Sequence, residues 1–498
     1  MNDVLVIFGN QLFHPDLLRS AVPDRARCRI VLVEDPQLCR RYAYHKQKLV
    51  LVLAAMRQYA ALLETRGYDV RYHSLDEATG WRAAVRQAAH ERQAARLLHF
   101  EVESPDLSRA LGQFAAREAL VHRVLPSPMF LTSHDDFAEH LAAERTPKLL
   151  PFYKAQRRRL QVLVSAGGEP VGGRWSFDQL NRERLPRHMH PDEPPVLKHP
   201  AVVHEVKALV ADQFATHPGG LRHFWVPTNH ADAERWLDSF LATRFWNFGT
   251  YEDALTDRSA FVYHSALAPL LNIGLLTPRQ VLDRTLDYAA GNAVPVNSVE
   301  GFVRQIIGWR EFVRGVYHHY YQPMQSRNIW NADRKLTDSW YAGSTGLAPM
   351  DHVIGKALKL GWAHHIERLM VAANLMNLSG IQPQEVYRWF MEMFVDAYDW
   401  VMVPNVFGMG LTSEGGIFTS KPYICGSNYV LKMGDFKRGA WCDVMDGLLW
   451  RFVAHHERTL RANHRLAPMV ANLARVARKR PEIFSLADEF IDTHTRAA

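Results

Sequence analysis

The sequence predicts an α/β domain with a doubly wound parallel sheet, followed by an all-helical domain. Short apolar runs alternate with helical periodicity over the first 135 residues, whereas helical periodicity alone fills the chain from about residue 211. The chain has 498 residues, too many for one ordinary hydrophobic core. We therefore expect an α/β domain over residues 1–135, a connector over 136–210 and a helical domain over 211–498.

Five short apolar runs bounded by polar or turn residues are expected to be strands. They are Val4–Phe8, Cys28–Glu34, Asp69–His73, Leu97–Glu101 and Val121–Leu125. The helices expected between them are Tyr42–Thr65, Thr79–Gln93 and Leu107–Ala116. Ligands of such sheets bind beyond the carboxyl ends of the strands, so the loop Gly9-Asn10-Gln11-Leu12 is a candidate binding edge. That loop is not a GxGxxG dinucleotide fingerprint.

The connector is predicted to be irregular. Glycines crowd Gly167–Gly173, and Pro186–Pro200 is rich in proline and histidine. Beyond it, helical periodicity indicates a series of helices. The main ones are Asp232–Thr243, Pro278–Ala289, Val299–Tyr317, Met350–Lys359, Trp362–Leu378 and Pro383–Phe394.

Composition excludes several classes of protein. Hydrophobic residues make up 47% and charged residues 22%, which is typical of globular and not of disordered chains. The sequence has neither an 18-residue apolar run nor a leader of the secretory type, and its four cysteines form no CxxC pair. We expect a cytoplasmic protein without a membrane span, a disulfide framework or a cysteine zinc site. The net charge of +7 gives a modest indication of a polyanionic partner.

Three segments of the helical half carry candidate chemistry. Tyr263–Leu276 opens a helix with Ser265 and free backbone amides, which suits a phosphate, although an ordinary helix cap has the same residues and is more common. In Glu300–Phe312, Gln305 lies one helical turn from Trp309. A Gln and an Arg in this aromatic setting could hold a heterocycle and a phosphate, or they could form a charged face beside a buried Trp.

The third segment is Gly361–Met370. At a spacing of four residues, His364 and Arg368 would share a helix face, and Arg368 could pair with Asp396 of a neighbouring helix. Adjacent histidines such as His364 and His365 are more often structural than catalytic. The segment alone therefore leaves both roles open.

Taken together, these motifs resemble the photolyase/cryptochrome flavoproteins, and most closely their bacterial iron–sulfur (6-4) photolyase-like branch. The resemblance spans nearly the whole chain. Its motifs occur in order and at similar spacing: Pro170–Asp178, Ser265–Leu267, Trp309–Phe312, Gly361–His364, Arg388–Met391 and Pro404–Val406.

The resemblance implies FAD bound in the helical domain. The residues that would hold it are Tyr251, His264, Ser265, Ala266, Leu267, Ala268, Gln305, Trp309, Arg310, Arg368, Asp396 and Met402. It also implies an antenna, 6,7-dimethyl-8-ribityllumazine, on the α/β domain. The positions that match its site are Gly9, Gln11, Glu34, His45 and Lys48.

The sequence departs from this branch at the iron–sulfur ligands. Three of the four cysteine positions are occupied by Pro349, Lys437 and Ala440, and only Cys442 lies near the fourth. One thiolate cannot hold a cubane cluster, so we expect no iron–sulfur cluster and no other metal. A second departure is Met402, which stands where the family commonly places a polar or acidic group facing the flavin N5. A thioether cannot donate a hydrogen bond there.

The resemblance implies light-driven repair of UV-damaged DNA, with the (6-4) pyrimidine photoproduct as the expected lesion. The lesion would be flipped out of the duplex, and the basic surface would bind phosphates. His365, with His364 beside it, is the expected proton donor, because histidine titrates near neutrality. Photoreduction is expected to run through Trp389 with Tyr341 or Trp340.

Two other functions remain open at this stage. A cryptochrome-like blue-light photoreceptor would share the fold and the flavin but would not repair DNA. A helical nucleic-acid-binding protein without catalysis would lack the flavin. We expect a monomer in each case.

Overall fold

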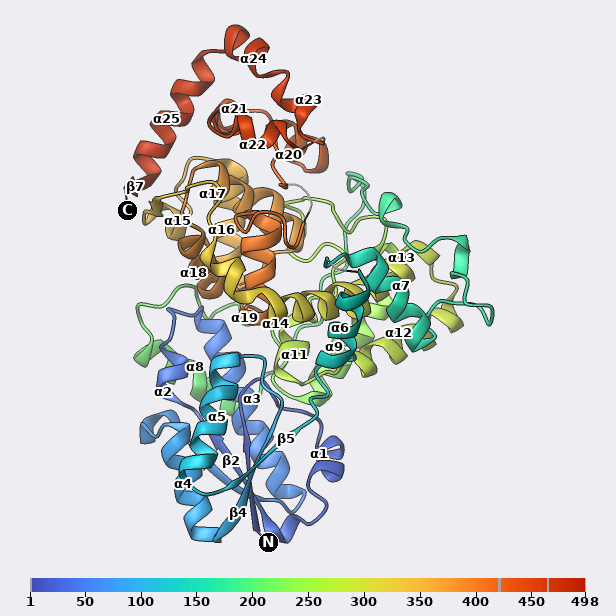
Figure 1. The fold of residues 1–498 in the computed structure, drawn as a ribbon, viewed down its shortest axis with the longest axis vertical. Helices are drawn as coiled ribbons and strands as arrows, with labels where there is room; N and C mark the ends of the chain where they lie inside the picture. The colour runs from blue at the N-terminus through green and yellow to red at the C-terminus, as the bar shows by residue number, and fades with distance from the viewer. Residues whose placement is uncertain (1, 145, 420–421, 464, 498) are drawn as a thin grey trace.

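The first domain is built on a five-stranded sheet that is parallel throughout, with strand order β3-β2-β1-β4-β5. The strands are β1 (Asn2–Ile7), β2 (Cys28–Val33), β3 (Asp69–His73), β4 (Ala94–Phe100) and β5 (Val121–Leu125). The computed structural model describes residues 2–144, 146–419, 422–463 and 465–497. Figure 1 shows this sheet at one end of the molecule, with the helical domain stacked beyond it. The predicted fold class is confirmed, with each strand within two or three residues of its expected bounds.

Alternation along β1 explains why helices cover both faces of the sheet. Val4 and Val6 belong to a core shared with α4 (Trp81–Arg92) and α5 (Pro105–Arg117). Leu5 and Ile7 point to the opposite face and join the core that includes α3 (Lys46–Thr65). Both faces are therefore dry, as parallel sheets require.

The carboxyl edge of the sheet is the junction with the helical domain. Chain order reverses between β1 and β4, which makes this edge the topological switch point. The backbone N–H of Leu12, after β1, donates to the carbonyl of Ile273 at 2.9 Å. After β4, the carboxylates of Glu101 and Glu103 accept bonds from Arg314 of the helical domain, each at 2.9 Å from their Oε2 atoms.

The range predicted as an irregular connector contains regular helices, which corrects that expectation. They are α6 (His134–Glu144), α7 (Leu149–Leu160) and α8 (Ala201–Gln213). Helix α7 buries Phe152 and Tyr153 against residues Arg304–Arg310, and α8 packs on α3. These helices are amphipathic and short, and their glycine- and proline-rich flanks hid them. The domain boundaries themselves stay a prediction.

The second half is helical, as predicted, apart from a two-stranded antiparallel pair of β6 (Arg334–Leu336) and β7 (Thr495–Ala497). Its main α-helices are α9 (His230–Thr243), α11 (Ala268–Ile273), α12 (Pro278–Asn292), α13 (Val296–Val303), α14 (Glu311–Ser326), α16 (Ala348–Leu360), α17 (Asn374–Leu378), α18 (Pro383–Met393), α19 (Asp399–Val403), α21 (Ala440–His455), α24 (Leu473–Lys479) and α25 (Glu482–His494). In Figure 1 the last helices form a layer at the end opposite the sheet. Within the described residues, none of the helices combines the length and apolarity needed to cross a membrane.

Three π-helical stretches interrupt this domain at Arg304–Arg310, Glu367–Ala373 and Pro404–Gly410. Such stretches are rare and often mark functional sites. The sequence predicted continuous α-helix through the first two. It also predicted a helix from Trp362, whereas the structure begins it at His365, so that His364 precedes the helix and its carbonyl accepts from the Arg368 N–H at 3.1 Å. The expected helix face shared by His364 and Arg368 is therefore wrong.

Candidate functional site

A cavity of about 470 Å³ opens in the helical domain. This volume lies within the range of small-molecule and cofactor sites. Four stretches of chain line it: His264–Asn272, the π-helical stretch Arg304–Arg310 with its flanks, Trp362–Ala373, and Asp396–Gly410. All three π-helical stretches contribute to the wall, so the local widening of each helix is placed where the cavity needs room.

The His264–Ala268 segment turns sharply along one wall. Ala266 has a φ of 52°, in the left-handed region that non-glycine residues rarely adopt. Helix α11 begins at Ala268 with no side-chain cap, so Ser265 does not form the ordinary helix cap that the sequence allowed. Ser265 faces the cavity instead, and its carbonyl accepts from the indole N–H of Trp236 at 2.9 Å.

Gln305 and Arg310 project from the first π-helical stretch. Nε2 of Gln305 donates to Glu252 Oε1 at 2.6 Å. The Arg310 guanidinium donates to Asn272 Oδ1 at 2.7 Å and lies 4.7 Å from the ring centres of both Phe130 and Trp400. Burial lowers the pKa of Arg310 to about 10, which leaves it charged at neutral pH.

Arg368 and Asp396 form a buried ion pair on the opposite wall. Nη1 of Arg368 donates to Asp396 Oδ1 at 2.8 Å, and its Nε donates to the carbonyl of Ala363 at 2.7 Å. The pairing that the sequence suggested is therefore present. The guanidinium also lies 4.0 Å from the ring centre of Phe394.

Three histidines meet at the mouth of the cavity. The rings of His264 and His364 are stacked with centroids 5.0 Å apart, and the His365 ring lies 5.4 Å from that of His264. His364 is buried, and burial drives its pKa well below the ordinary value. The His365 side chain keeps 48% of its surface exposed.

His365 has a carboxylate partner. Its Nε2 donates to Asp253 Oδ1 at 3.1 Å. Desolvation would lower the pKa of this imidazole, but the hydrogen bond and charge of Asp253 outweigh it, so that the pKa lies above its ordinary value. His365 is therefore the one of the three that is held in its charged form near neutrality.

Several cavity residues were not predicted from the sequence. Glu252 is buried, and desolvation raises its pKa to about 7, against the opposing charge of Arg304. Trp400 and Asn405 lie on either side of the predicted Met402, and all three line the cavity. Their closeness in sequence to predicted residues was the available signal: Glu252 and Asp253 directly follow Tyr251.

Tyr251 itself lies outside the cavity wall. It belongs to a small separate core, with its ring 5.7 Å from that of Tyr263. The other eleven residues expected to hold the cofactor, and both histidines expected to act in catalysis, line the cavity.

The cavity presents buried donors that the protein leaves without a partner. Arg368 Nη2, Arg310 Nε and Trp400 Nε1 are each buried, and none has a hydrogen-bond partner among the described residues. Unpaired buried donors are costly, so a site of this kind fits a ligand that supplies acceptors. An FAD molecule, with its carbonyl oxygens, ring nitrogens and phosphates, has that chemistry.

The residues expected to carry electrons form a connected group behind the cavity. Trp389 is fully buried, and its indole N–H donates to the carbonyl of Trp340 at 2.9 Å. Its ring lies 5.3 Å from that of Phe390, which lines the cavity. Tyr341 is half-buried, and its hydroxyl donates to Glu392 Oε2 at 2.7 Å. Burial raises the pKa of Tyr341 above its ordinary value.

The positions expected to bind the antenna do not fit a ligand. Glu34 accepts from Arg57 at 2.7 and 3.0 Å and from the Leu75 N–H at 2.7 Å. The amide nitrogen of Gln11 donates to the carbonyls of Phe100 and Glu101 at 3.2 and 3.0 Å. These two side chains are buried and already fully engaged.

The remaining antenna positions are also committed to the protein. Both ring nitrogens of His45 are hydrogen-bonded, and Nζ of Lys48 donates to the carbonyl of Ala397. A Cβ on Gly9 would lie 2.6 Å from Val52 Cγ1, so this glycine allows the loop to approach α3. The four side chains therefore stabilise the junction between domains and offer no free polar group to a lumazine.

The positions that match the cluster ligands lie in one region. The rings of His352 and Phe436 are 5.7 Å apart, which brings the start of α16, with Pro349, beside Lys437 and Ala440. Cys442 is buried, as are Cys28, Cys39 and Cys425, and all four are free thiols. The absence of an iron–sulfur cluster stays a prediction.

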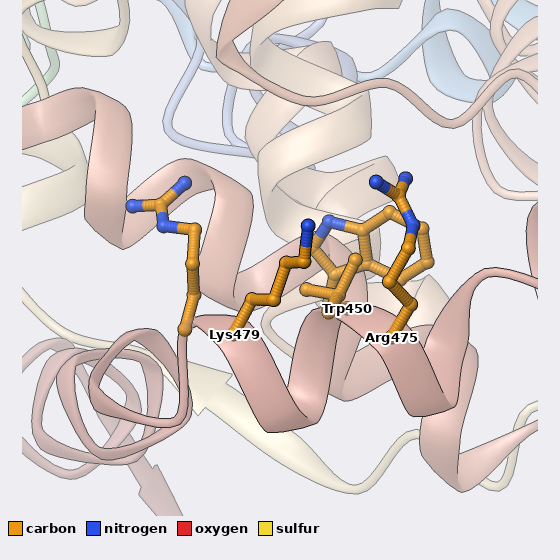
Figure 2. A pocket seen from close by; sticks show the side chains of 5 residues that line it. Trp450, Arg475 and Lys479 are labelled. Atoms are coloured by element: carbon orange, nitrogen blue, oxygen red, sulfur yellow. The ribbon is translucent and has the colours of Figure 1, made fainter.

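A second hollow, of about 240 Å³, lies at the surface between α21 and α24. Figure 2 shows Arg475 and Lys479 extending in front of the indole of Trp450. The third cation, Arg480, is paired with Asp443 at 2.6 Å, so Arg475 and Lys479 carry most of the positive charge of this hollow. It shares no lining residue with the large cavity.

Comparison with known proteins decides the family. The chain is 32% identical over 490 residues to a (6-4) photolyase of Agrobacterium fabrum, and the alignment covers 96% of each chain. The chain belongs to the photolyase/cryptochrome family. The family model described as "deoxyribodipyrimidine photo-lyase-related protein" matches residues 5–226, and that of the FAD-binding domain of DNA photolyase matches residues 302–431.

Solved structures of the photolyase/cryptochrome family share this fold. A crystal structure of a class III photolyase from Agrobacterium tumefaciens has a TM-score of 0.60 at 19% identity, covering 94% of this chain and 90% of that one. A cryptochrome from Synechocystis has a TM-score of 0.56 at 16% identity, covering 92% and 89%. The FAD-binding match includes the cavity segments from Phe302 to Gly410, so the cavity is the FAD site of a photolyase/cryptochrome protein.

Proposed function

We propose that this protein is a photolyase that repairs UV-damaged DNA in light, and that its lesion is the (6-4) pyrimidine photoproduct. The observation that carries the proposal is the His365–Asp253 pair at the mouth of the FAD cavity. This repair needs an electron and a proton at the lesion. Bound FAD would supply the electron on excitation by light.

The proton is assigned to His365. Its imidazole is 48% exposed, so a base flipped out of the duplex can reach it, and Asp253 keeps it protonated near neutral pH. His364 is buried, its pKa is lowered, and it therefore packs behind His365 as a neutral ring. This divides the two adjacent histidines into one donor and one positioning residue.

The cofactor would be held by the donors described above. Arg310 and Arg368 would meet acceptors on the flavin and its phosphates, and Gln305 and Trp309 would line the ring system. Met402 would face the flavin edge where it can offer only a weak acceptor. Trp389, with Trp340 or Tyr341 behind it, would carry an electron from the surface toward the cavity.

The DNA would contact the basic surface around the cavity mouth. Arg182 lines the mouth with its side chain 59% exposed, and the protein carries a net charge of +7. We expect the protein to act as a monomer, which light scattering would test. The lumazine antenna is left out of the proposal, because the polar groups at its expected positions are already engaged.

The deciding experiment uses the flavin-loaded protein and an oligonucleotide that carries one defined (6-4) lesion. Illumination should restore the two pyrimidines, which product analysis by chromatography and mass spectrometry would detect. A cyclobutane dimer in the same sequence and a dark sample are the controls. Normal photoreduction without repair of either lesion would refute the proposal.

That last outcome would favour a blue-light photoreceptor. One observation supports this second candidate: Met402 replaces a polar group at the flavin edge and would change which flavin redox state persists in light. A light-driven redox change that alters the shape or partners of the protein, without repair, would identify it.

A further inference from the structure

We propose that His264, His364 and His365 form a binding site for a divalent transition metal, with zinc as the reference ion. One nitrogen from each ring comes within 4.8 Å of the others. Three imidazoles with a fourth position open to a cavity are the ligand set of catalytic-type zinc sites. The inference goes beyond the proposed repair function and is tested without DNA or light.

The spacing of the rings fits a tetrahedral metal. With zinc–nitrogen bonds of about 2.0–2.1 Å, each ring centroid lies about 3.2 Å from the metal, and two centroids lie about 5.2 Å apart. The observed centroid separations are 5.0 Å for His264–His364, 5.4 Å for His264–His365 and 6.1 Å for His364–His365. The longest one involves His365, whose half-exposed side chain has room to rotate inward.

His364 provides independent evidence for a ligand. It is fully buried, yet neither of its ring nitrogens has a hydrogen-bond partner among the described residues. Its nearest charged atom is Glu367 Oε2, at 3.6 Å from Nε2, which is too long for a hydrogen bond. A buried ring that is left unpaired in this way loses free energy unless something else occupies its lone pair.

The other two rings are oriented by outer-shell acceptors, as metal-bound histidines usually are. Nε2 of His264 lies 3.0 Å from the carbonyl of Glu252, and Nε2 of His365 lies 3.1 Å from Asp253 Oδ1. These contacts fix Nε2–H as the donor in both rings. Nδ1 of each, which has no hydrogen-bond partner among the described residues, is left to bind the metal.

Neighbouring cations do not exclude a metal, because each has its own carboxylate. Lys356 pairs with Glu367 at 2.7 Å, and Arg368 pairs with Asp396 at 2.8 Å. A second histidine group, Glu103 with His134 and His318, differs in this respect. There the Arg314 guanidinium already occupies Glu103 at 2.9 Å and lies 3.0 Å from His134 Nε2, so it takes the place of a metal.

The test is zinc binding to the untagged, flavin-loaded protein in the dark. Isothermal titration calorimetry should show one zinc per chain, and His364→Gln should weaken its affinity at least tenfold. His134→Gln, from the group filled by Arg314, is the matched control and should leave the affinity unchanged. No zinc binding at micromolar concentration, or equal affinity in His364→Gln, would overturn the proposal.

A second measurement does not depend on a variant that folds. X-ray absorption at the zinc edge of the wild-type complex should show three imidazole nitrogens at about 2.0–2.1 Å. A shell with a sulfur or with fewer than two imidazoles would also overturn the proposal. A protein that binds zinc in this way but repairs no lesion would keep the metal site and refute the repair function, so the two failures are distinguishable.

Discussion

Nε2 of His365 donates to the carboxylate of Asp253 at 3.1 Å, on the rim of a cavity whose other polar walls are buried. The pair joins an exposed imidazole to a carboxylate that is 20% exposed. The carboxylate stabilises the charged ring, and the open side of the ring faces solvent. Proton delivery to a ligand at the mouth of the cavity is the chemistry that this pair supports, and it gives the first two predictions.

His365→Ala should retain FAD and photoreduction but lose (6-4) repair by a factor of about 10² to 10⁴, the usual contribution of a general acid. Repair is measured by product analysis, and photoreduction by flavin absorption. His455→Ala, an exposed histidine on α21, is the control and should repair normally. Loss of flavin in His365→Ala would assign a structural role to His365, and unchanged repair would remove it from the mechanism.

Asp253→Asn should move the pH dependence of repair. Because Asp253 raises the pKa of His365, the protonated donor persists to a higher pH in the wild type and is lost as pH rises through that pKa. In the variant the pKa falls, so the alkaline decline in repair rate should occur at lower pH. Asp257→Asn changes an exposed neighbour and should keep the wild-type profile. Identical profiles for Asp253→Asn and the wild type would contradict the role given to this carboxylate.

Arg368→Leu should lose FAD and stability together. It leaves the Asp396 carboxylate buried without its partner, which typically costs about 3–5 kcal/mol. The ratio of flavin to protein absorption and the unfolding midpoint in denaturant measure the two effects. Arg388→Leu removes the more exposed pair with Glu385 and should cost less than about 1 kcal/mol with FAD retained. Equal behaviour of the two variants would count against the buried pair as part of the cofactor site.

Trp389→Phe should slow photoreduction, because phenylalanine is far harder to oxidise, while repair by chemically reduced protein persists. Transient absorption and a repair assay with dithionite-reduced samples separate the two. Trp330→Phe is the matched control: Trp330 is also buried in the helical domain, but it packs on Phe452 and does not line the cavity. Photoreduction at the wild-type rate in Trp389→Phe would exclude this route.

Metal analysis of the purified protein should find no stoichiometric iron. A cubane cluster would give about four irons per chain, and it needs several thiolates. Pro349, Lys437 and Ala440 supply none. Aerobic purification loses labile clusters, so anaerobic purification is the control, and about four irons per chain in that sample would refute the prediction.

Local patterns in the sequence were enough to predict the fold class. The alternation that places Val4 and Leu5 on opposite faces of β1 is encoded within five residues, because side chains of a strand alternate whatever surrounds them. The helix Asp232–Thr243 was likewise predicted to within two residues by its apolar period. The motifs also located the cavity, since eleven of the twelve expected cofactor residues line it.

Long-range packing decided what the sequence left open. Nothing local distinguishes Lys48 as a ligand from Lys48 as a buried donor to Ala397, because that carbonyl is supplied by a segment nearly 350 residues away. The π-helical stretches and the late helix start at His365 depend on neighbours in the same way. The sequence by itself determined the periodicity of the elements and the residue types of the site. The tertiary structure alone decided which polar groups the protein satisfies internally and which, such as His364, it leaves for a ligand, because hydrogen-bond partners are set by contacts between distant segments.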